Sequence, residues 1–199
     1  MKSKLPLKWS LVILGVAGIL FSAAIIFFMS GSRANPVLPT SNTVPQNLQQ
    51  ARAALPSRLM IPAINVDAAI ESVGLTSQGA MAVPAGPADA AWFDLGPRPG
   101  ESGSAVIAGH EGWKDNIKAV FDDLYKLQKG DKIYVEDEQG ATTTFVVSGM
   151  QTYDQNGDAS GIFSSTDGKA HLNLITCEGT WNAAEKSYSN RLVVFTDKE

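Results

Sequence analysis

Short apolar runs, each ended after a few residues by glycine or proline, recur from residue 57 to the end of the chain. Lys132–Glu136 and Thr142–Ser148 are rich in β-branched residues and flank Gln139-Gly140, a plausible hairpin turn. Many short strands separated by turn residues are typical of a β-barrel or a β-sandwich. The pattern predicts eight strands: Arg58–Ile61, Val66–Ile70, Ala80–Val83, Ser104–Ala108, Lys132–Glu136, Thr142–Ser148, His171–Thr176 and Leu192–Thr196.

One segment has the spacing of a helix. Its apolar residues recur at helical intervals: Ile117, Val120, Phe121, Leu124 and Leu127. Asp115 or Asn116 would cap this helix, and Gly130 would end it. Residues 84–103, rich in glycine and proline, predict a long ordered loop.

The start of the chain has the pattern of a membrane anchor. Trp9–Ser30 holds 22 residues without a charge, and at about 1.5 Å per residue a helix of this length spans the hydrocarbon core of a bilayer. Lysines at positions 2, 4 and 8 precede the segment, so the positive-inside bias places residues 1–8 in the cytoplasm and everything after residue 30 outside the cell. Residues 9–30 are therefore predicted to form a single transmembrane helix.

A cleaved signal peptide is the alternative interpretation, because Ser32-Arg33-Ala34 is a tolerable small-x-small cleavage site. The apolar stretch exceeds the usual length of such a region, which favours an uncleaved anchor. Residues 31–56 contain four prolines and many polar residues, and they predict a flexible stalk. Residues 57–199 then form one folded extracellular domain.

Charge is unevenly distributed along the chain. All 20 Asp and Glu residues and 11 of the 16 Lys and Arg residues follow residue 56, so the folded domain carries a net charge of −9. An acidic domain argues against nucleic acid as a partner.

The single cysteine, Cys177, ends an apolar strand in a domain predicted to lie outside the cell. An unpaired cysteine there is either a small buried hydrophobe or a functional thiol. Alternation along the strand places Cys177 on the face opposite Leu172, Leu174 and Thr176. Of the two histidines, His110 directly follows a buried strand, whereas the other is predicted to be a solvated surface residue: His171.

Cys177, His110 and Arg191, each at a predicted strand end, supply what acyl transfer needs. A thiol attacks as thiolate and requires a nearby base or cation. The tetrahedral intermediate requires hydrogen-bond donors, and arginine carries five. Val193 and Phe195 share the face of Arg191 on the last strand. Any domain holds some residues of these types, so spacing alone leaves the assignment open.

The sequence resembles the sortase family. Leu174-Ile175-Thr176-Cys177, followed by Arg191 opening the apolar last strand, is similar to the sortase signature. Residues 105–110 (AVIAGH) resemble the family's histidine strand end, and residues 58–64 (RLMIPAI) and 96–100 (GPRPG) resemble its first strand and a loop. The resemblance covers 57–199, and the short segment after the cysteine is closest to class E and class F sortases.

The resemblance implies a mainly β fold, a closed eight-stranded barrel with one or two short helices, and a cysteine transpeptidase. Such an enzyme cleaves an LPxTG-like sorting signal between Thr and Gly and passes the acyl group to an amine of a cell-wall precursor or surface protein. It implies that Cys177 is the nucleophile, His110 the general acid/base, and Arg191 a support for substrate and oxyanion. Thr176 and Glu178 become substrate-binding candidates, Glu178 through its N–H group.

Several features depart from the family or remain open. Gly112 stands where related chains often have aspartate, and Glu111 sits beside the histidine. Trp113 and Trp181 either wall the substrate groove or are ordinary packing aromatics. No Asp-Pro-aromatic lid motif precedes the barrel, which disfavours a lidded pilus polymerase.

No cofactor or metal is expected. Asp154–Asp158 hints at a calcium loop but lacks glycine at the sixth position and glutamate at the twelfth, so it predicts an acidic turn. Two other functions stay open beside the transpeptidase: a surface cysteine hydrolase that uses the same residues with water, and a non-catalytic surface binding module.

Overall fold

The computed structural model describes residues 53–184 and 187–199. The predicted anchor at 9–30 and most of the predicted stalk at 31–56 lie outside the described residues. Among the residues that are described, no helix has both the length and the apolar character needed to cross a membrane.

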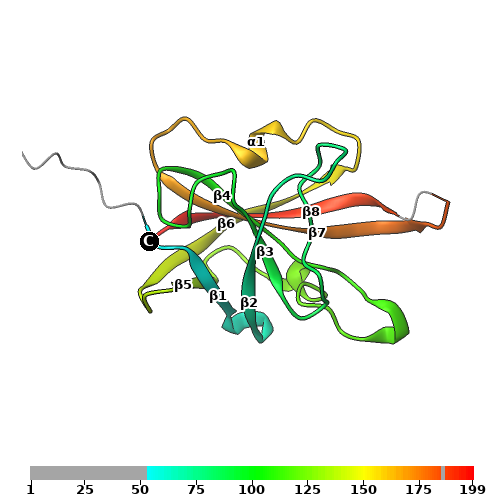
Figure 1. Ribbon diagram of the computed structural model, residues 1–199, viewed down its shortest axis with the longest axis horizontal. Coiled ribbons are helices and arrows are strands. Elements are labelled where there is room, and N and C mark those ends of the chain that lie inside the picture. Colours follow the sequence, from blue (N-terminus) through cyan, green and yellow to red (C-terminus); the bar gives the residue numbers. More distant parts are fainter. Residues whose placement is uncertain (1–52, 185–186) are drawn as a thin grey trace, which may run out of the picture. The chain divides into compact units, whose positions relative to one another are not determined.

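Eight strands within the described residues form one closed barrel, in the order β1-β2-β3-β4-β7-β8-β6-β5 (Figure 1). The β2–β3 and β4–β7 pairs are parallel, and the other six pairs are antiparallel, including the β1–β5 pair that closes the barrel. The predicted closed barrel is therefore confirmed. The strands are β1 (Pro56–Ile61), β2 (Val66–Val73), β3 (Ala90–Phe93), β4 (Gly103–Ala108), β5 (Lys132–Asp137), β6 (Thr142–Asp154), β7 (Ala170–Asn182) and β8 (Ser187–Lys198).

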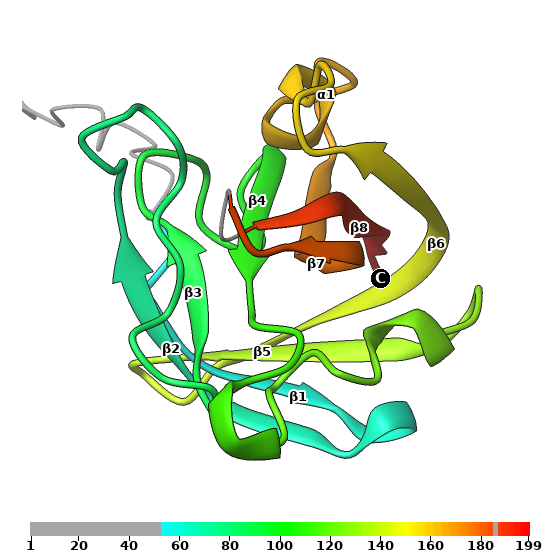
Figure 2. The same ribbon diagram turned by 90° about the vertical axis from the view of Figure 1, so that its right-hand side faces the viewer.

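Helical structure in the described ranges is limited to four short segments. The only α-helical turn there, α1 (Ser160–Phe163), lies outside the barrel, and Figure 2 shows it next to the end of β4. The other three are 3₁₀ turns: η1 (Pro62–Ile64), η2 (Lys114–Asn116) and η3 (Leu124–Lys126).

The apolar core fills the barrel, because alternate side chains of each strand point inward. Leu172 and Leu174 of β7 are fully buried there. A second, smaller apolar cluster lies on the opposite side of the same strands. Its fully enclosed members are Val106 of β4, Val193 of β8 and Ile162 of α1. The wall formed by β4, β7 and β8 is therefore covered on both faces.

The predicted helix over 117–127 is wrong, and the reason lies in its backbone hydrogen bonds. The N–H of Val120 donates to the carbonyl of Pro87, and the N–H of Phe121 donates to the carbonyl of His110. Both N–H groups therefore donate to carbonyls of other segments and make no hydrogen bond within a helix. Phe121 and Leu124 are nevertheless buried, as the apolar spacing required. The segment crosses one end of the barrel as turns.

The third predicted strand is also misplaced. Ala80–Val83 does not form a strand, and the only pairing there among described residues is an isolated bridge between Leu75 and Met81. The predicted loop 84–103 instead contains β3, which pairs with both β2 and β4. The sequence of β3, Ala-Ala-Trp-Phe, is short and half alanine, so its local β-propensity is weak and its position depends on its neighbours.

Three strands are about twice as long as predicted: β6, β7 and β8, with 13, 13 and 12 residues. Figure 1 shows β7 and β8 running together beyond the end of the barrel. Because β8 begins at Ser187, Arg191 lies inside this strand and does not open it, which corrects the sequence prediction.

Candidate active site

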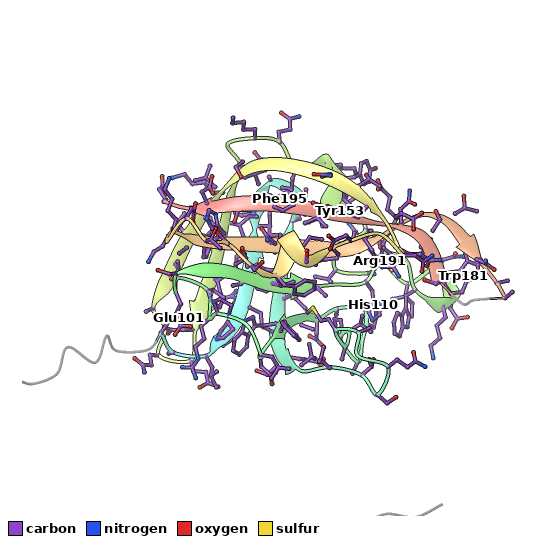
Figure 3. All side chains as sticks on the ribbon, turned by 90° about the horizontal axis from the view of Figure 1, so that it is seen from above. Glu101, His110, Tyr153, Trp181, Arg191 and Phe195 are labelled. Carbon is purple, nitrogen blue, oxygen red and sulfur yellow. The ribbon has the colours of Figure 1, made fainter. Side chains whose placement is uncertain are left out.

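The register of β4, β7 and β8 brings the three predicted catalytic residues together. Cys177 and Arg191 are direct cross-strand partners in the β7–β8 pair. The end of β4 pairs in parallel with β7 as far as Ile175, so His110, two residues beyond β4, is level with Cys177. Figure 3 shows His110 and Arg191 toward the same end of the domain, with Glu101 at the other end.

Gly109 fixes the main chain in front of His110. Its N–H donates to the carbonyl of Ile175 (3.0 Å), and its carbonyl accepts from Oγ1 of Thr176 (2.8 Å). A Cβ atom at this position would lie only 2.4 Å from the ring of Phe121. Glycine is therefore required, because the chain passes directly between β7 and that ring.

An open cavity of about 510 Å³ lies on the outer face of the barrel wall at this end. His110, Cys177 and Arg191 all line it. The rest of the wall is mainly apolar and comes from the loop before β3, from β3 itself, from the end of β6 and from the segment around α1. Its large members are Leu75, Met81, Val83, Phe93, Tyr153, Ile162 and Phe163. The cavity thus joins a reactive end to an apolar groove.

The imidazole of His110 is held by two groups. Its Nε2 donates to the carbonyl of Pro84, with 2.9 Å between nitrogen and oxygen. The ring of Trp113 meets it edge to face, with 4.7 Å between ring centroids and 60° between planes. Trp113 thus contacts His110 and is not among the residues that line the cavity.

The guanidinium of Arg191 is held by its own strand. Nη1 donates to the carbonyls of Tyr188 (3.0 Å) and Asn190 (2.8 Å), and Nη2 donates to Oγ of Ser187 (3.1 Å). These bonds engage three of its five donors. They fix the cation on the strand position opposite Cys177.

The Cys177 thiol is half-buried and unpaired. Burial raises its pKa, the charge of Arg191 lowers it, and the charge of Glu111 raises it, so that the net shift is upward. The pKa of Glu111 is itself raised by burial and by the carboxylates of Glu178 and Asp122. Its Oε2 atom is buried without a hydrogen-bond partner. The surroundings of Cys177 therefore disfavour its thiolate relative to a free cysteine.

The structure gives the predicted substrate-binding residues different surroundings. Thr176 borders the cavity, but its side chain points into the barrel, where its hydroxyl is engaged by Gly109. The carboxylate of Glu178 accepts from Oγ1 of Thr152 (2.7 Å). Their contacts with substrate, including the N–H of Glu178, stay predictions.

Trp181 lies away from His110. Its side chain is 52% exposed and packs edge to face against Tyr188, with 5.2 Å between ring centroids. Figure 3 shows Trp181 farther out than Arg191 along the domain. The two tryptophans that the sequence treated as a pair therefore lie in different places: Trp113 contacts the imidazole, and Trp181 stands on the outer part of the β7–β8 hairpin.

Two parts of the site were missed at the level of sequence: the charge of Glu111 and the layer of chain that covers the outer wall. The sequence did contain a signal for the covering layer. Both Ala105–Ala108 and Leu192–Phe195 are apolar at consecutive positions, which indicates strands buried on both faces. For the influence of Glu111 on the thiol the sequence held no signal beyond its place beside His110.

His171 does not belong to this site; it lies at the surface, but two carboxylates hold it there in place of free solvent. Its side chain is only 17% exposed and lies between Asp197, 2.8 Å from Nδ1, and Asp167, 3.0 Å from Nε2. Burial would lower the pKa of His171, but the bonds to the two aspartates outweigh it, so the net shift is upward. The ring ties β7 and β8 to the loop that precedes β7.

The acidic segment Asp154–Asp158 forms a turn. Asp154 accepts from the N–H of Asn156 (2.8 Å), and Asp158 accepts from the N–H of Ser160 (2.9 Å). Within the described ranges, no group of three or more His, Cys, Asp or Glu residues is placed to hold a metal ion.

The fold is similar to solved structures of sortases. Sortase C-1 from Actinomyces oris has a TM-score of 0.54 at 24% identity, over 72% of this chain and 72% of that one. Sortase A from Corynebacterium diphtheriae, solved as a lid mutant, has a TM-score of 0.56 at 22% identity, over 76% and 74%. The pilus-related sortase C of Group B Streptococcus has a TM-score of 0.56 at 22% identity, over 74% and 68%. At these identities the likeness concerns the fold.

No curated protein matches the chain significantly. Residues 59–199, most of the chain, match the model of the Sortase domain. Sortases are cysteine transpeptidases, and a half-buried thiol that shares one cavity with a histidine and an arginine agrees with that chemistry. The chain therefore belongs to the sortase family.

Proposed function

We propose that this sortase is anchored in the cell membrane, cleaves an LPxTG-like sorting signal between Thr and Gly, and joins the new carboxyl end to an amine on the cell surface. The observation that carries the proposal is the shared cavity of Cys177, His110 and Arg191. The apolar groove that continues from it suits an extended peptide with an aliphatic side chain. The uncharged segment 9–30 supports the anchor.

The first half-reaction forms a thioester. His110 takes the proton of the Cys177 thiol, and the resulting thiolate attacks the Thr carbonyl carbon. The oxyanion of the tetrahedral intermediate is stabilised by Arg191, with the N–H of Glu178 as a second donor. As the intermediate collapses, the C–N bond breaks and protonated His110 gives its proton to the departing glycine nitrogen. The acyl part stays on sulfur, and the glycine-side peptide leaves as a free amine.

The second half-reaction consumes an amine. Its nitrogen attacks the thioester carbonyl, and neutral His110 accepts the proton that this nitrogen loses. The C–S bond then breaks, an amide forms, and Cys177 leaves as thiolate. A thioester is much more susceptible to amine attack than an amide, so the transfer proceeds without ATP. The short segment between Cys177 and Arg191 supports a place among class E and class F sortases.

Mass spectrometry tests the function. Full-length protein in detergent is incubated with a library of sorting-signal peptides and triglycine, and we expect the acyl part to appear on triglycine. Cys177→Ala should abolish transfer, His110→Ala should nearly abolish it, and the double variant should be little worse, because the two residues act as a unit. Products carrying water in place of triglycine would instead identify a hydrolase.

The thiol offers an independent control, because Cys177 is the only cysteine in the chain. One equivalent of an alkylating agent should inactivate the enzyme, and a sorting-signal peptide should protect it. If the Cys177→Ala variant still releases the glycine-side peptide, or if the thiol stays unreactive in the folded protein, the transpeptidase mechanism is excluded.

A further inference from the structure

The hydrogen bond between His110 and Pro84 decides which ring nitrogen is available for chemistry. A carbonyl oxygen accepts and never donates, so Nε2 must carry a proton whenever this bond is made, in the neutral ring as well as in the charged one. The neutral imidazole then has its lone pair on Nδ1. Any proton that His110 gains or loses while the bond persists is therefore carried by Nδ1.

The accepting carbonyl belongs to a fixed part of its loop. Pro84 is buried, and its ring fixes one backbone angle. The chain on either side is held by main-chain bonds: the N–H of Ala82 donates to Gly74 (3.0 Å), and the carbonyl of Pro87 accepts from Val120 (2.8 Å). The oxygen that meets Nε2 is thus anchored both to the end of β2 and to the segment that crosses the barrel end.

Trp113, which contacts the same ring, is held by a short turn. The N–H of Gly112 donates to one oxygen of Asp122 (2.7 Å), and the other oxygen accepts from Ala119 (3.1 Å). Gly112 has a φ of 65°, a left-handed conformation that favours glycine and turns the chain after His110. The indole of Trp113 then packs against the imidazole, 4.7 Å away, while staying outside the cavity lining.

We propose that Trp113 is a positioning residue which, together with the Pro84 carbonyl, makes Nδ1 of His110 the proton-exchanging atom of this sortase. The proposal rests on the function proposed above. Rotation of the ring by half a turn would put Cε1 in place of Nε2 and break the Pro84 bond, and the intermediate rotations would break the edge-to-face contact with Trp113. In the first half-reaction Nδ1–H protonates the departing nitrogen, and in the second Nδ1 takes a proton from the attacking amine. The other proton stays on Nε2 throughout, where it is donated in the hydrogen bond to the Pro84 carbonyl.

Histidine NMR tests the nitrogen assignment without any substrate. The chain has two histidines, so full-length protein labelled with ¹⁵N-histidine in detergent gives two ring systems, and His171→Gln leaves only that of His110. At a pH where the ring is neutral we expect a single tautomer with the proton on Nε2. A neutral ring protonated on Nδ1, or an even mixture of tautomers, overturns the proposal whether or not the enzyme transfers peptides.

Variants of Trp113 test its positioning role. Trp113→Leu keeps apolar volume without an aromatic edge or face, and we expect kcat to fall by about 10²-fold with KM little changed, because small misplacements of a catalytic group are costly. The His110 spectrum of this variant should become a mixture of tautomers. Trp113→Phe should recover most of kcat and the single tautomer. Tyr125→Leu, at an aromatic residue that is 59% exposed, is the matched control and should leave both unchanged.

The outcomes separate three readings of Trp113. Unchanged kcat and tautomer in Trp113→Leu would overturn its positioning role. A rise in KM with normal kcat would make Trp113 part of the substrate wall, which also overturns the proposal. If Trp113→Leu proves unstable in a thermal melt, Trp113→Phe and the spectrum of the unaltered protein still decide. If the unaltered protein shows a single Nε2-protonated tautomer but transfers no peptide, the result contradicts the proposed function and leaves the tautomer assignment standing.

Discussion

Arg191 lies opposite Cys177 with a guanidinium that is oriented by three acceptors of its own strand. We expect Arg191→Ala to lower kcat by about 10²–10³-fold, the usual effect of removing one oxyanion donor. Arg191→Lys should recover little, because an ammonium keeps the charge but lacks the planar fork that reaches several acceptors at once. Release of the glycine-side peptide measures both variants.

A matched control for Arg191 is Arg58→Ala, which removes an exposed arginine of β1 that is paired with Asp67 of β2; neither strand contributes a residue to the cavity. Near wild-type activity in Arg191→Ala would exclude Arg191 from the mechanism. An equal fall in kcat in Arg58→Ala would show that the loss of one positive charge, and not the position of Arg191, causes the effect.

Glu111 acts on the thiol through its charge. Because a nearby carboxylate disfavours the thiolate, it raises the pKa of Cys177, and Glu111→Gln should lower that pKa. The rate of alkylation as a function of pH measures this: its rise should move to lower pH in Glu111→Gln and to higher pH in Arg191→Ala. Glu138→Gln, at an exposed turn, should leave the profile unchanged. A shift to higher pH in Glu111→Gln would contradict the assignment.

Some residues of the site could be predicted from the sequence, and others could not. Cys177 and His110 were predictable because each follows an apolar run in the sequence, and the parallel register of β4 with β7 then brings them level. The predicted strand end at Cys177 is wrong, because β7 continues to Asn182. The Pro84 carbonyl was not predictable, because it is a main-chain group 26 residues away whose position depends on the path of a loop. Trp113 was found by its closeness in sequence to His110, but its contact with the ring needed the structure.

At the level of elements, the end of β4 depends on close packing at Gly109. A Cβ atom there would meet the ring of Phe121 at 2.4 Å, so Gly109→Ala must displace either that ring or the chain that carries His110. Overpacking of this kind costs about 1–3 kcal/mol, and we expect a lower Tm together with lower kcat. Gly149→Ala in β6 is the matched control, since nothing lies within 4 Å of its Cβ position. Equal melting temperatures for the two variants would contradict this packing role.

Strands with their own β-branched residues were predictable, whereas elements defined by neighbours were not. β5 appears nearly where the pattern placed it, and β6 begins at the predicted residue, because their residues favour extended chain on their own. β3 was missed because it owes its place to β2 and β4. The 117–127 segment has helical spacing, yet Val120 and Phe121 give their N–H groups to distant carbonyls. In both segments, hydrogen bonds to distant parts of the chain determine the backbone conformation.

For the whole molecule, the closed barrel was expected from resemblance to a family and not from alternation alone, which left a sandwich equally open. The two parallel pairs, β2–β3 and β4–β7, require connections that leave one strand end and return to the other. No local pattern marks such pairings. The second covered face of the barrel wall, which forms the cavity, likewise depends on where the loop before β3 and the α1 segment lie.

The proposed anchor makes a prediction for the full chain. Full-length protein should stay in the membrane fraction after a carbonate wash, with its C-terminal domain open to external protease, because residues 9–30 are uncharged and lysines precede them. A version without residues 1–30 should appear in the wash. Recovery of a mature soluble form beginning near Asn35 would identify a cleaved signal peptide in place of an anchor.

Because the groove lies outside the barrel, the peptide preference of such an enzyme can change during evolution separately from its core. The residues that hold the barrel together face inward, as Leu172 and Leu174 do, whereas the groove is covered by the loop around Met81 and by the α1 segment. Substitutions at the partly exposed positions of that outer layer reshape the groove without repacking the barrel interior, so they cost less folding free energy than substitutions at inward-facing positions. New peptide preferences are thus accessible by single steps in two short segments, on a scaffold that stays the same.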